Sequence, residues 1–319
     1  MIVGGPEIPN FKSAHNSRPA NYCRKFAMDT PYSAEKDDLY YPAKHAVFFP
    51  AGRPKSDAAL CAELSRLAYC NLETSFGFDK DRIRKVLAQV GFTDCQFFEN
   101  SKKPDCEGTH CFLALEEDDK AVPKLAVVAF RGTDKDDPTD LAHDFNARPE
   151  SWKQQRSKVH TGFAEALAEV EADVLAALQA MRCRVFFTGH SLGAAMATLL
   201  ASLRPPDSLY TFGSPRVGDA AFVATLDHLD NHRYVDCCDI VTRVPPRSFG
   251  YEHLGDPYYI DMARHVRFNP PQPDIDKDCS QAEIDYLEHY SWRIGDLPLR
   301  PLADHAPVNY VLPVTADTP

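Results

Sequence analysis

Apolar residues alternate between helical and strand-like spacing along the chain from about residue 56. Ser56 is an expected helix N-cap, and apolar positions at helical spacing follow it as far as residue 68. A second helix is expected over residues 83–90. Apolar runs at residues 111–115 and 125–130 lie on either side of an acidic turn, and this arrangement predicts two strands joined as a hairpin.

A longer helical pattern comes next. Apolar residues three and four positions apart over residues 163–181 predict one long helix with a single buried face. A short apolar strand at 184–188, a tight turn and a helix over 192–203 follow it. This alternation of strands and helices is typical of a parallel sheet covered on both faces. Further strands are expected at 208–212, 233–235 and 265–268, and a proline-rich loop from 269 to about 282.

The first 55 residues have a different character from the rest. They are rich in Pro, Asn, Tyr and charged residues and show no sustained periodicity, so we expect an extension that wraps around the domain. The total length of 319 residues fits one large α/β domain. We therefore expect an N-terminal extension over residues 1–55 and a single folded domain over 56–319.

Composition and charge narrow the range of partners. Hydrophobic residues make up 44% and charged residues 25% of the chain, as in ordinary globular proteins with a large core. A net charge of −11 provides no basic surface for nucleic acid and repels an anionic membrane. We therefore expect a neutral or weakly polar small-molecule substrate, no nucleic-acid partner and at most peripheral contact with lipid. The sequence does not indicate the oligomeric state.

Two observations favour a cytoplasmic location. The opening segment MIVGGPEIPNFKSAHN lacks the basic residues and apolar run of a secretory signal. The ten cysteines are scattered and contain no C-x-x-C pair, so we expect most of them to be reduced core residues. Both features are typical of proteins that stay inside the cell.

The pentapeptide Gly189-His190-Ser191-Leu192-Gly193 has the form G-x-S-x-G and lies between a predicted strand and a predicted helix. Such a turn forces the serine backbone into a strained conformation, and residues without bulk on either side let the strand and helix approach closely. The serine hydroxyl then lies at a helix N-terminus, where amide hydrogens favour negative charge. We therefore predict that Ser191 is the nucleophile of an acyl-transfer reaction.

Several segments in order resemble the class 3 lipases, the fungal-type triacylglycerol lipase family. They are V-V-A-F-R-G-T at 127–133, V-H-T-G-F at 159–163, the pentapeptide at 189–193, Y-T-F-G-S-P-R-V-G at 210–218 and D-I-V-T-R-V-P-P at 239–246. The resemblance covers roughly residues 58 to 310 and not the N-terminal segment. It implies an α/β-hydrolase fold with a mostly parallel central sheet, hydrolysis of carboxylic esters, and no cofactor.

A serine is a weak nucleophile until a base accepts its proton and an acid orients that base. The resemblance places the acid at Asp239, which opens the D-I-V segment, and Asp236 remains the rival candidate three residues earlier. It places the base at His305, within the D-H pair near the C-terminus. The resulting chain order of Ser, Asp and His is that of the α/β-hydrolases.

The other histidines have different explanations. His190 belongs to the pentapeptide, His160 precedes a helix, and His253 falls in a G-Y-E-H segment that the family carries without a catalytic role. His265 and His289 flank the proline-rich segment, where the resemblance is weakest, and both remain open as alternatives.

The oxyanion that forms during acyl transfer needs fixed hydrogen-bond donors. The backbone amide of Leu192, directly after the nucleophile, is one expected donor. The resemblance supplies Thr133, at the end of F-R-G-T, as the second. An ordinary N-cap or turn role for Thr133 is the alternative.

The segment at residues 134–143 occupies the position of the lid in the resembled family. Lipase lids are amphipathic, whereas this segment is dominated by acidic residues, and Leu141 is its only large aliphatic residue. We therefore expect little activation at lipid interfaces, a preference for short or medium acyl chains, and an open or weakly closing site.

A metal site is conceivable near His228 and His232, which are spaced one helical turn apart with acidic residues and two cysteines nearby. The spacing does not provide a complete ligand set. We therefore predict no metal and interpret the region as a surface helix followed by a strand.

Together these observations predict a serine carboxylic-ester hydrolase of the lipase or esterase type, which acts on lipid or small acyl esters through an acyl-enzyme on Ser191. Two alternatives remain. One is a phospholipase-type effector, and the other is a non-catalytic binding protein built on the same fold.

Overall fold

The computed structural model describes residues 30–44, 47–72, 77–99, 108–133, 149–153 and 156–317. Its main feature is an eight-stranded sheet of order β1-β2-β3-β6-β7-β9-β11-β12. The five strands from β3 to β11 run parallel, and β1, β2 and β12 are antiparallel at the edges. The strands are β1 (Asp94–Glu99), β2 (His110–Glu117), β3 (Pro123–Phe130), β6 (Arg184–His190), β7 (Ser208–Phe212), β9 (Asn231–Asp236), β11 (Pro257–Ile260) and β12 (Val266–Phe268). The expected mostly parallel central sheet is confirmed.

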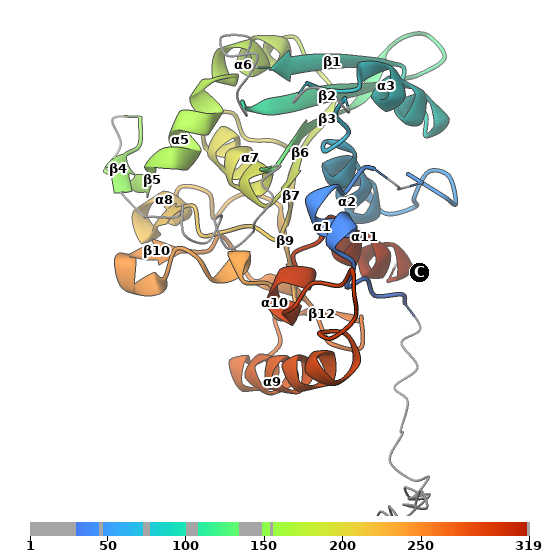
Figure 1. The fold of residues 1–319 in the computed structure, drawn as a ribbon. Coiled ribbons are helices and arrows are strands. Elements are labelled where there is room, and N and C mark those ends of the chain that lie inside the picture. The colour runs from blue at the N-terminus through green and yellow to red at the C-terminus, as the bar shows by residue number, and fades with distance from the viewer. Residues whose placement is uncertain are drawn as a thin grey trace, which may run out of the picture.

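Helices cover both faces of this sheet (Figure 1). One face is covered by α2 (Asp57–Leu67), α3 (Lys80–Gln89) and α11 (Pro307–Ala316), and the other by α5 (Thr161–Ala168), α6 (Glu171–Gln179) and α7 (Leu192–Leu203). Each set of helices packs its apolar side chains into a separate buried cluster against the strands. This arrangement confirms the predicted α/β architecture, because a parallel sheet is apolar on both faces and needs a helical layer on each.

Smaller elements surround the central layers. A four-stranded sheet of order β10-β8-β5-β4 is formed by β4 (Pro149–Ser151), β5 (Lys158–His160), β8 (Gly218–Asp219) and β10 (Tyr251–Glu252). The remaining helices are α1 (Lys36–Tyr40), α8 (Ala220–Ala224), α9 (Gln272–His289), α10 (Arg300–Ala303) and two 3₁₀ turns at Val241–Arg243 and Arg247–Phe249. Among the helices described, none has the length and apolar character needed to cross a membrane.

Most elements predicted from local pattern are present. Ser56 caps α2, since its hydroxyl accepts a hydrogen bond from the Ala59 amide at 3.1 Å. The hairpin of β2 and β3, the strand β6 and the helix α7 follow the expected ranges closely. The strands β7, β9 and β12 were also expected, whereas no sequence signal predicted β11, a four-residue strand that begins with proline.

The single long helix expected over residues 163–181 is wrong, because the structure divides it into α5 and α6. The predicted apolar face is nevertheless buried along both helices. Thr109, from a distant part of the chain, explains the break: its hydroxyl donates to the Ala166 carbonyl at 2.6 Å and its amide donates to the Glu169 carboxylate at 2.7 Å. These contacts stabilise the end of α5.

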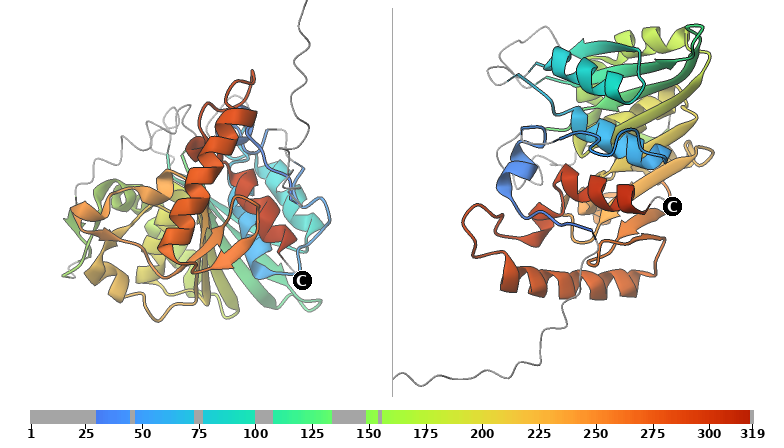
Figure 2. Two further views of the ribbon diagram at one scale, coloured as in Figure 1. Left: turned by 90° about the horizontal axis from the view of Figure 1, so that it is seen from below. Right: turned by 90° about the vertical axis from the view of Figure 1, so that its right-hand side faces the viewer.

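The proline-rich loop expected from residue 269 to about 282 is also wrong. Helix α9 begins at Gln272 and continues for 18 residues (Figures 1 and 2). Pro273 lies in its first turn, where a missing amide hydrogen breaks no helical hydrogen bond. Cys279, Ala282 and Tyr286 are the buried positions, at the spacing of one helical face.

The described part of the N-terminal segment packs against the domain. Phe48 and Phe49 join the buried cluster around α2, and Leu39 joins a smaller cluster with Tyr286. The Ser33 amide donates to the Asn309 side chain at 2.9 Å. These contacts are those of a wrapping segment, and the domain boundary at residue 55 stays a prediction.

Buried charges join the C-terminal part of the chain to the end of β9. Arg264, in the turn between β11 and β12, donates two hydrogen bonds to Asp236 at 2.8 and 2.9 Å, and both side chains are fully buried. Arg264 also donates to the Asn309 carbonyl on α11. Asp304 accepts hydrogen bonds from the Arg300 guanidinium and the Cys238 amide. The segment that contains His305 is therefore attached to the end of β9 through hydrogen bonds of the buried Arg264 and Asp304 side chains.

Replacing Arg264 with Met should lower the free energy of unfolding by about 3–5 kcal/mol, because it leaves the Asp236 carboxylate buried without its partner. Chemical denaturation followed by circular dichroism measures this change. Arg267→Met is the matched control, since Arg267 is partly exposed and lies 3.8 Å from Asp274. It should change stability by less than about 1 kcal/mol. Equal losses in the two variants would contradict the structural importance of the buried pair.

Candidate active site

The strand-to-helix turn at Ser191 has the strained backbone that its sequence predicts. Ser191 has φ 59° and ψ −127°, between the end of β6 and the start of α7. A Cβ atom added to Gly189 would lie 2.3 Å from the Gly193 carbonyl carbon, and one added to Gly193 would lie 2.4 Å from the Phe130 carbonyl oxygen. Neither approach is possible for a residue with a side chain, so both glycines are required for the close packing at this turn.

Ser191, His305 and Asp239 form a continuous chain of hydrogen bonds. His305 Nε2 lies 2.9 Å from Ser191 Oγ, and His305 Nδ1 lies 2.8 Å from Asp239 Oδ2. With Asp239 ionised, Nδ1 carries the proton and donates to the carboxylate, so Nε2 is free to accept the serine hydroxyl hydrogen. Ser191 directly follows β6 and Asp239 follows β9, which places both at the carboxyl edge of the parallel sheet.

The position of Asp239 distinguishes it from Asp236. Its Oδ1 accepts the Val241 amide at 2.8 Å, and its Oδ2 accepts the Tyr310 hydroxyl in addition to His305. The Asp236 carboxylate instead forms a buried ion pair with Arg264. The structure therefore brings Asp239, and not the rival carboxylate, to the histidine.

A second histidine, His190, contacts the main chain of His305. His190 Nε2 lies 2.9 Å from the carbonyl oxygen of His305, and His190 Nδ1 lies 2.8 Å from the Tyr69 hydroxyl. Burial, reinforced by the nearby His305, holds the pKa of His190 well below its ordinary value. The neutral ring therefore donates from Nε2 to the His305 carbonyl and accepts from Tyr69.

Sequence reasoning missed these supporting groups. Tyr310 lies five positions after His305, and this short separation was a usable signal for a side chain near the proposed base. Tyr69 follows α2 and carries no local motif. Tyr69 and His190 are more than a hundred residues apart in the chain, so no local pattern predicts their contact.

The remaining histidines lie in other environments. His160 stacks on Phe163 with ring centroids 4.1 Å apart, and burial lowers its pKa to about 4. His253 Nε2 lies 2.7 Å from the Thr242 carbonyl oxygen. His265 lies near Asp261, and His289 lies on the exposed side of α9. The histidine at hydrogen-bonding distance from Ser191 Oγ is His305.

The two expected oxyanion donors follow the ends of neighbouring strands. Leu192 is the first residue of α7, directly after Ser191. Thr133 is half-buried and comes three residues after β3 ends at Phe130, the residue against which Gly193 packs. Gly132 lies so close to Tyr69 and to the His190 carbonyl that an added Cβ would clash with both. The loop that carries Thr133 therefore lies against the turn that carries Ser191, and the oxyanion role of both residues stays a prediction.

The expectation of an open or weakly closing site stays a prediction. Ser191 is 2% exposed and His305 is 3% exposed, so the nucleophile is covered. The composition of one loop does not determine the exposure of a residue that several elements surround. The acidic segment at residues 134–143, on which the expectation rested, lies outside the described residues.

The region of His228 and His232 differs from the expected surface helix. Helix α8 ends at Ala224, and His228 lies in the turn that follows it. His232 belongs to β9, where its ring stacks on Tyr210 at 4.6 Å. Within the described residues, the group with metal-ligand character is instead formed by Cys237, Cys238 and Cys279.

Comparison with known proteins places this arrangement in context. The family description "Lipase (class 3)" matches residues 127–249, which include the Ser191 turn and Asp239. A protein of Fusarium solani named "Secreted mono- and diacylglycerol lipase 1" is 39% identical over 137 residues, or 40% of this chain and 38% of the relative. A "Lipase" of Rhizomucor miehei is 33% identical over 156 residues and 43% of each chain. The matched region thus spans less than half the length of these relatives.

A solved structure agrees in overall fold. The crystal structure of a mutant form of the Penicillium cyclopium protein MDLA has a TM-score of 0.54 at 23% identity. The match covers 82% of this chain and 94% of that one. At this level of identity the agreement concerns the fold.

The expected cytoplasmic location is wrong, because relatives from Fusarium solani and Malassezia globosa carry the word "secreted" in their names. The cysteine pattern misled the interpretation. The structure describes eight free cysteines, and seven of them are buried. Free cysteine packs in a core like a small apolar residue, so the scattered spacing of core cysteines does not report on location.

The five ordered motifs agree with the matched family description, with the named lipase relatives and with the sheet topology. Residues 127–249 therefore match the class 3 lipase family.

Proposed function

We propose that the chain is a serine carboxylic-ester hydrolase that forms an acyl-enzyme on Ser191. The observation that carries the proposal is the hydrogen-bonded chain from Ser191 Oγ through His305 to Asp239. A buried serine does not need an oriented histidine and a buried carboxylate for stability, whereas nucleophilic catalysis requires all three.

His305 acts as the general base. It takes the hydroxyl proton through Nε2 as Ser191 Oγ attacks the ester carbonyl, and it returns the proton to the leaving alcohol. The carbonyl oxygen of the ester becomes negatively charged in the tetrahedral intermediate. The amides of Leu192 and Thr133 are the proposed donors to this oxyanion, in a buried site where such hydrogen bonds are stronger than in water. Water then releases the acid by the same steps.

Asp239 orients His305 and stabilises its protonated form. The Val241 amide and the Tyr310 hydroxyl occupy other lone pairs of the carboxylate and hold it in one orientation. His190 fixes the backbone of His305 at the same time. The base is therefore constrained on both its ring and its main chain, which favours a productive geometry before the ester binds.

The proposed substrates are neutral glycerides and small acyl esters. Relatives carry the name mono- and diacylglycerol lipase, and a neutral glyceride suits a chain with a net charge of −11 better than an anionic phospholipid does. A phospholipase activity and a non-catalytic role are the alternatives. The names of the relatives also favour an extracellular site of action.

Ser191→Ala should abolish labelling by a serine-reactive fluorophosphonate probe, because the probe forms its bond with an activated serine oxygen. In-gel fluorescence of the purified full chain measures the labelling. Ser280→Ala, on the exposed side of α9, is the matched control and should label like the parent chain. Failure of the parent chain to label, despite a folded state, would favour the non-catalytic alternative.

Asp239→Asn should keep the fold and lower kcat for a soluble ester by about 10⁴-fold, because an amide favours the wrong histidine tautomer. Steady-state hydrolysis of a short-chain nitrophenyl ester measures kcat, and circular dichroism checks the fold. Turnover close to that of the parent chain would transfer the role of the acid to another group, with Asp236 the first alternative.

Hydrolysis should be faster for short and medium acyl glycerides than for long ones, and it should not rise sharply at the solubility limit. The reason is the acidic character of residues 134–140, which suits insertion into lipid poorly. Rates measured across the solubility limit, with phospholipids beside the glycerides, test this preference. A sharp rise with long chains would overturn the preference, and faster phospholipid cleavage would favour the phospholipase alternative.

A further inference from the structure

Three cysteines form a compact group directly behind the proposed catalytic acid. The sulfur atoms of Cys237, Cys238 and Cys279 all lie within 4.8 Å of one another, and those of Cys237 and Cys238 are 3.6 Å apart. Cys237 and Cys238 immediately precede Asp239, whereas Cys279 comes from the middle of α9. The proposed hydrolytic mechanism uses none of these thiols.

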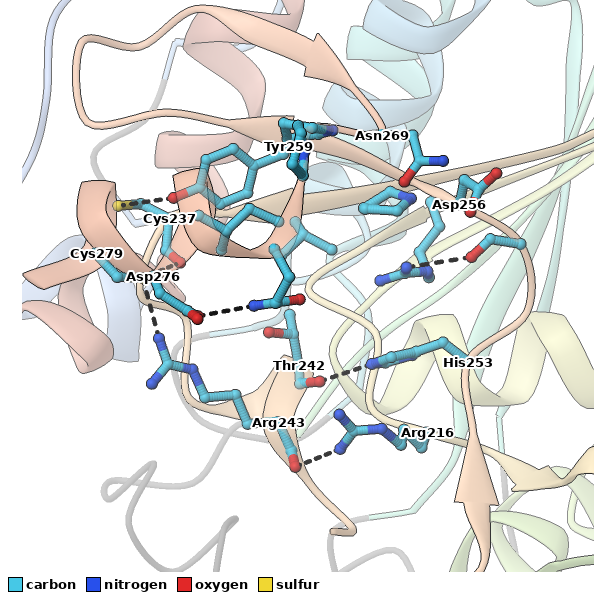
Figure 3. A pocket seen from close by; sticks show the side chains of 18 of the residues that line it. Arg216, Cys237, Thr242, Arg243, His253, Asp256, Tyr259, Asn269, Asp276 and Cys279 are labelled. Carbon is cyan, nitrogen blue, oxygen red and sulfur yellow. Dashed lines mark hydrogen bonds between the residues drawn. The ribbon is translucent and has the colours of Figure 1, made fainter. Parts of the chain in front are cut away.

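The surroundings of Cys279 favour its thiolate form. The Arg243 guanidinium lies 3.1 Å from Cys279 Sγ, in the view of Figure 3. The Cys279 sulfur also lies 2.8 Å from the Cys237 carbonyl oxygen, so it is held against the segment that precedes Asp239. The positive charge of Arg243 favours the thiolate, which is the nucleophilic form of cysteine, so Cys279 is the reactive member of the group.

Two of the three cysteines line a pocket. Its volume is about 1210 Å³, and its lining includes Cys237, Cys279, Tyr259 and Arg243 (Figure 3). Cys238 is fully buried and is not part of the lining. A small thiol reagent that enters the pocket therefore meets Cys279 and Cys237 first.

We propose that Cys237 and Cys279 are a redox-active pair whose disulfide fastens α9 to the segment that carries Asp239. A bond between Cys237 and Cys238 is unfavourable, because adjacent Cα atoms lie about 3.8 Å apart, below the roughly 4.4–6.8 Å usual for disulfides. Cys237 and Cys279 belong to different elements and are free of this constraint. The pair is a site of covalent modification separate from the proposed hydrolytic centre.

The chemistry requires a small-molecule disulfide, such as oxidised glutathione, as the oxidant. The Cys279 thiolate attacks one sulfur of this disulfide, forms a mixed disulfide and releases one glutathione thiolate. Cys237 then loses its proton to solvent, and its sulfur attacks Cys279 Sγ and displaces the second glutathione thiolate. Two cysteine thiols lose two electrons, and one glutathione disulfide becomes two glutathiones.

The bond would strengthen a weakly anchored part of the fold. Helix α9 lies at the lower margin of the molecule, away from the helices that flank the sheet (Figures 1 and 2). Its buried side chains join two small clusters, one with Cys237, Cys238 and Tyr259 and one with Leu39 and Leu302. Its outward side chains Ile284 and Leu287 are more than half exposed. A disulfide that closes a loop of about forty residues here restricts the unfolded chain substantially.

A metal ion explains the geometry less well. Structural zinc sites use four ligands, and the described group offers three sulfurs. The Arg243 guanidinium lies 3.1 Å from Cys279 Sγ, and its positive charge opposes a cation there. The nearby Asp278 carboxylate already accepts hydrogen bonds from the Tyr259 hydroxyl at 2.8 Å and the Met262 amide at 2.9 Å.

The test compares the full chain after oxidised glutathione with the same chain after dithiothreitol. Free thiols are alkylated, and the peptides are mapped by mass spectrometry. Oxidation should remove two free thiols, link the 237–238 peptide to the Cys279 peptide, and raise Tm by about 5 °C or more. These readouts do not depend on hydrolytic activity, so they succeed or fail independently of the proposed function.

Variants identify the partners. Cys279→Ser and Cys237→Ser should each abolish both the linkage and the Tm shift. Cys238→Ser and the distant Cys183→Ser should form it at the parental rate. An unchanged thiol count in the parent chain would overturn the proposal, as would a bond confined to Cys237 and Cys238. Stoichiometric zinc, retained after incubation with zinc alone and blocking oxidation, would overturn it in favour of a metal site.

Discussion

The close approach of β6 and α7 at Ser191 is the constraint on which the rest of the site depends. The serine backbone has a positive φ that costs free energy in any residue with a side chain, and the packing of the two elements has to maintain it. Gly189 and Gly193 make this packing possible because each lies where an added Cβ would overlap main-chain atoms. The turn presents Ser191 Oγ at the carboxyl edge of the sheet, and His305 and Asp239 are positioned relative to that fixed point.

Contacts of the main chain and of neighbouring residues, rather than of the imidazole ring, bring His305 to Ser191. His305 lies between α10 and α11, in a segment attached to the end of β9 by two contacts. Arg264, which is paired with Asp236, donates to the Asn309 carbonyl, and Asp304 accepts the Cys238 amide. His190 then holds the His305 carbonyl from the side of the turn. Two kinds of interaction therefore divide the work. Buried charges and the neutral His190 ring fix the main chain of the segment, and the Asp239 carboxylate fixes the orientation of the His305 ring.

The acid lies where these contacts meet the cysteine group. Asp239 follows Cys237 and Cys238 directly, and the Cys238 amide donates to Asp304, the residue before His305. Any covalent bond between this segment and α9 would thus form one residue away from contacts that position both the acid and the base. Helix α9 is therefore separated from Asp239 and His305 by very few residues.

Local sequence patterns were sufficient for the features that depend on neighbouring residues. The Ser56 cap, the hairpin of β2 and β3 and the G-x-S-x-G turn follow from residue types a few positions apart, because capping, alternation and steric limits act over that range. The resemblance of ordered motifs extended this reading to Asp239 and His305. The apolar spacing over residues 163–181 likewise identified the buried face correctly.

Only the tertiary structure decided the features that depend on distant partners. Thr109 ends α5 from more than fifty residues away, and the Arg264 guanidinium engages Asp236 and leaves Asp239 to meet His305. The contact of Tyr69 with His190 is of the same kind, as is the meeting of three cysteines from α9 and from the segment after β9. The sequence by itself thus determined most of the elements and the turn that carries Ser191. Folding decided which charges, rings and thiols meet, because hydrogen bonds and ion pairs depend on distance in space and not on separation along the chain.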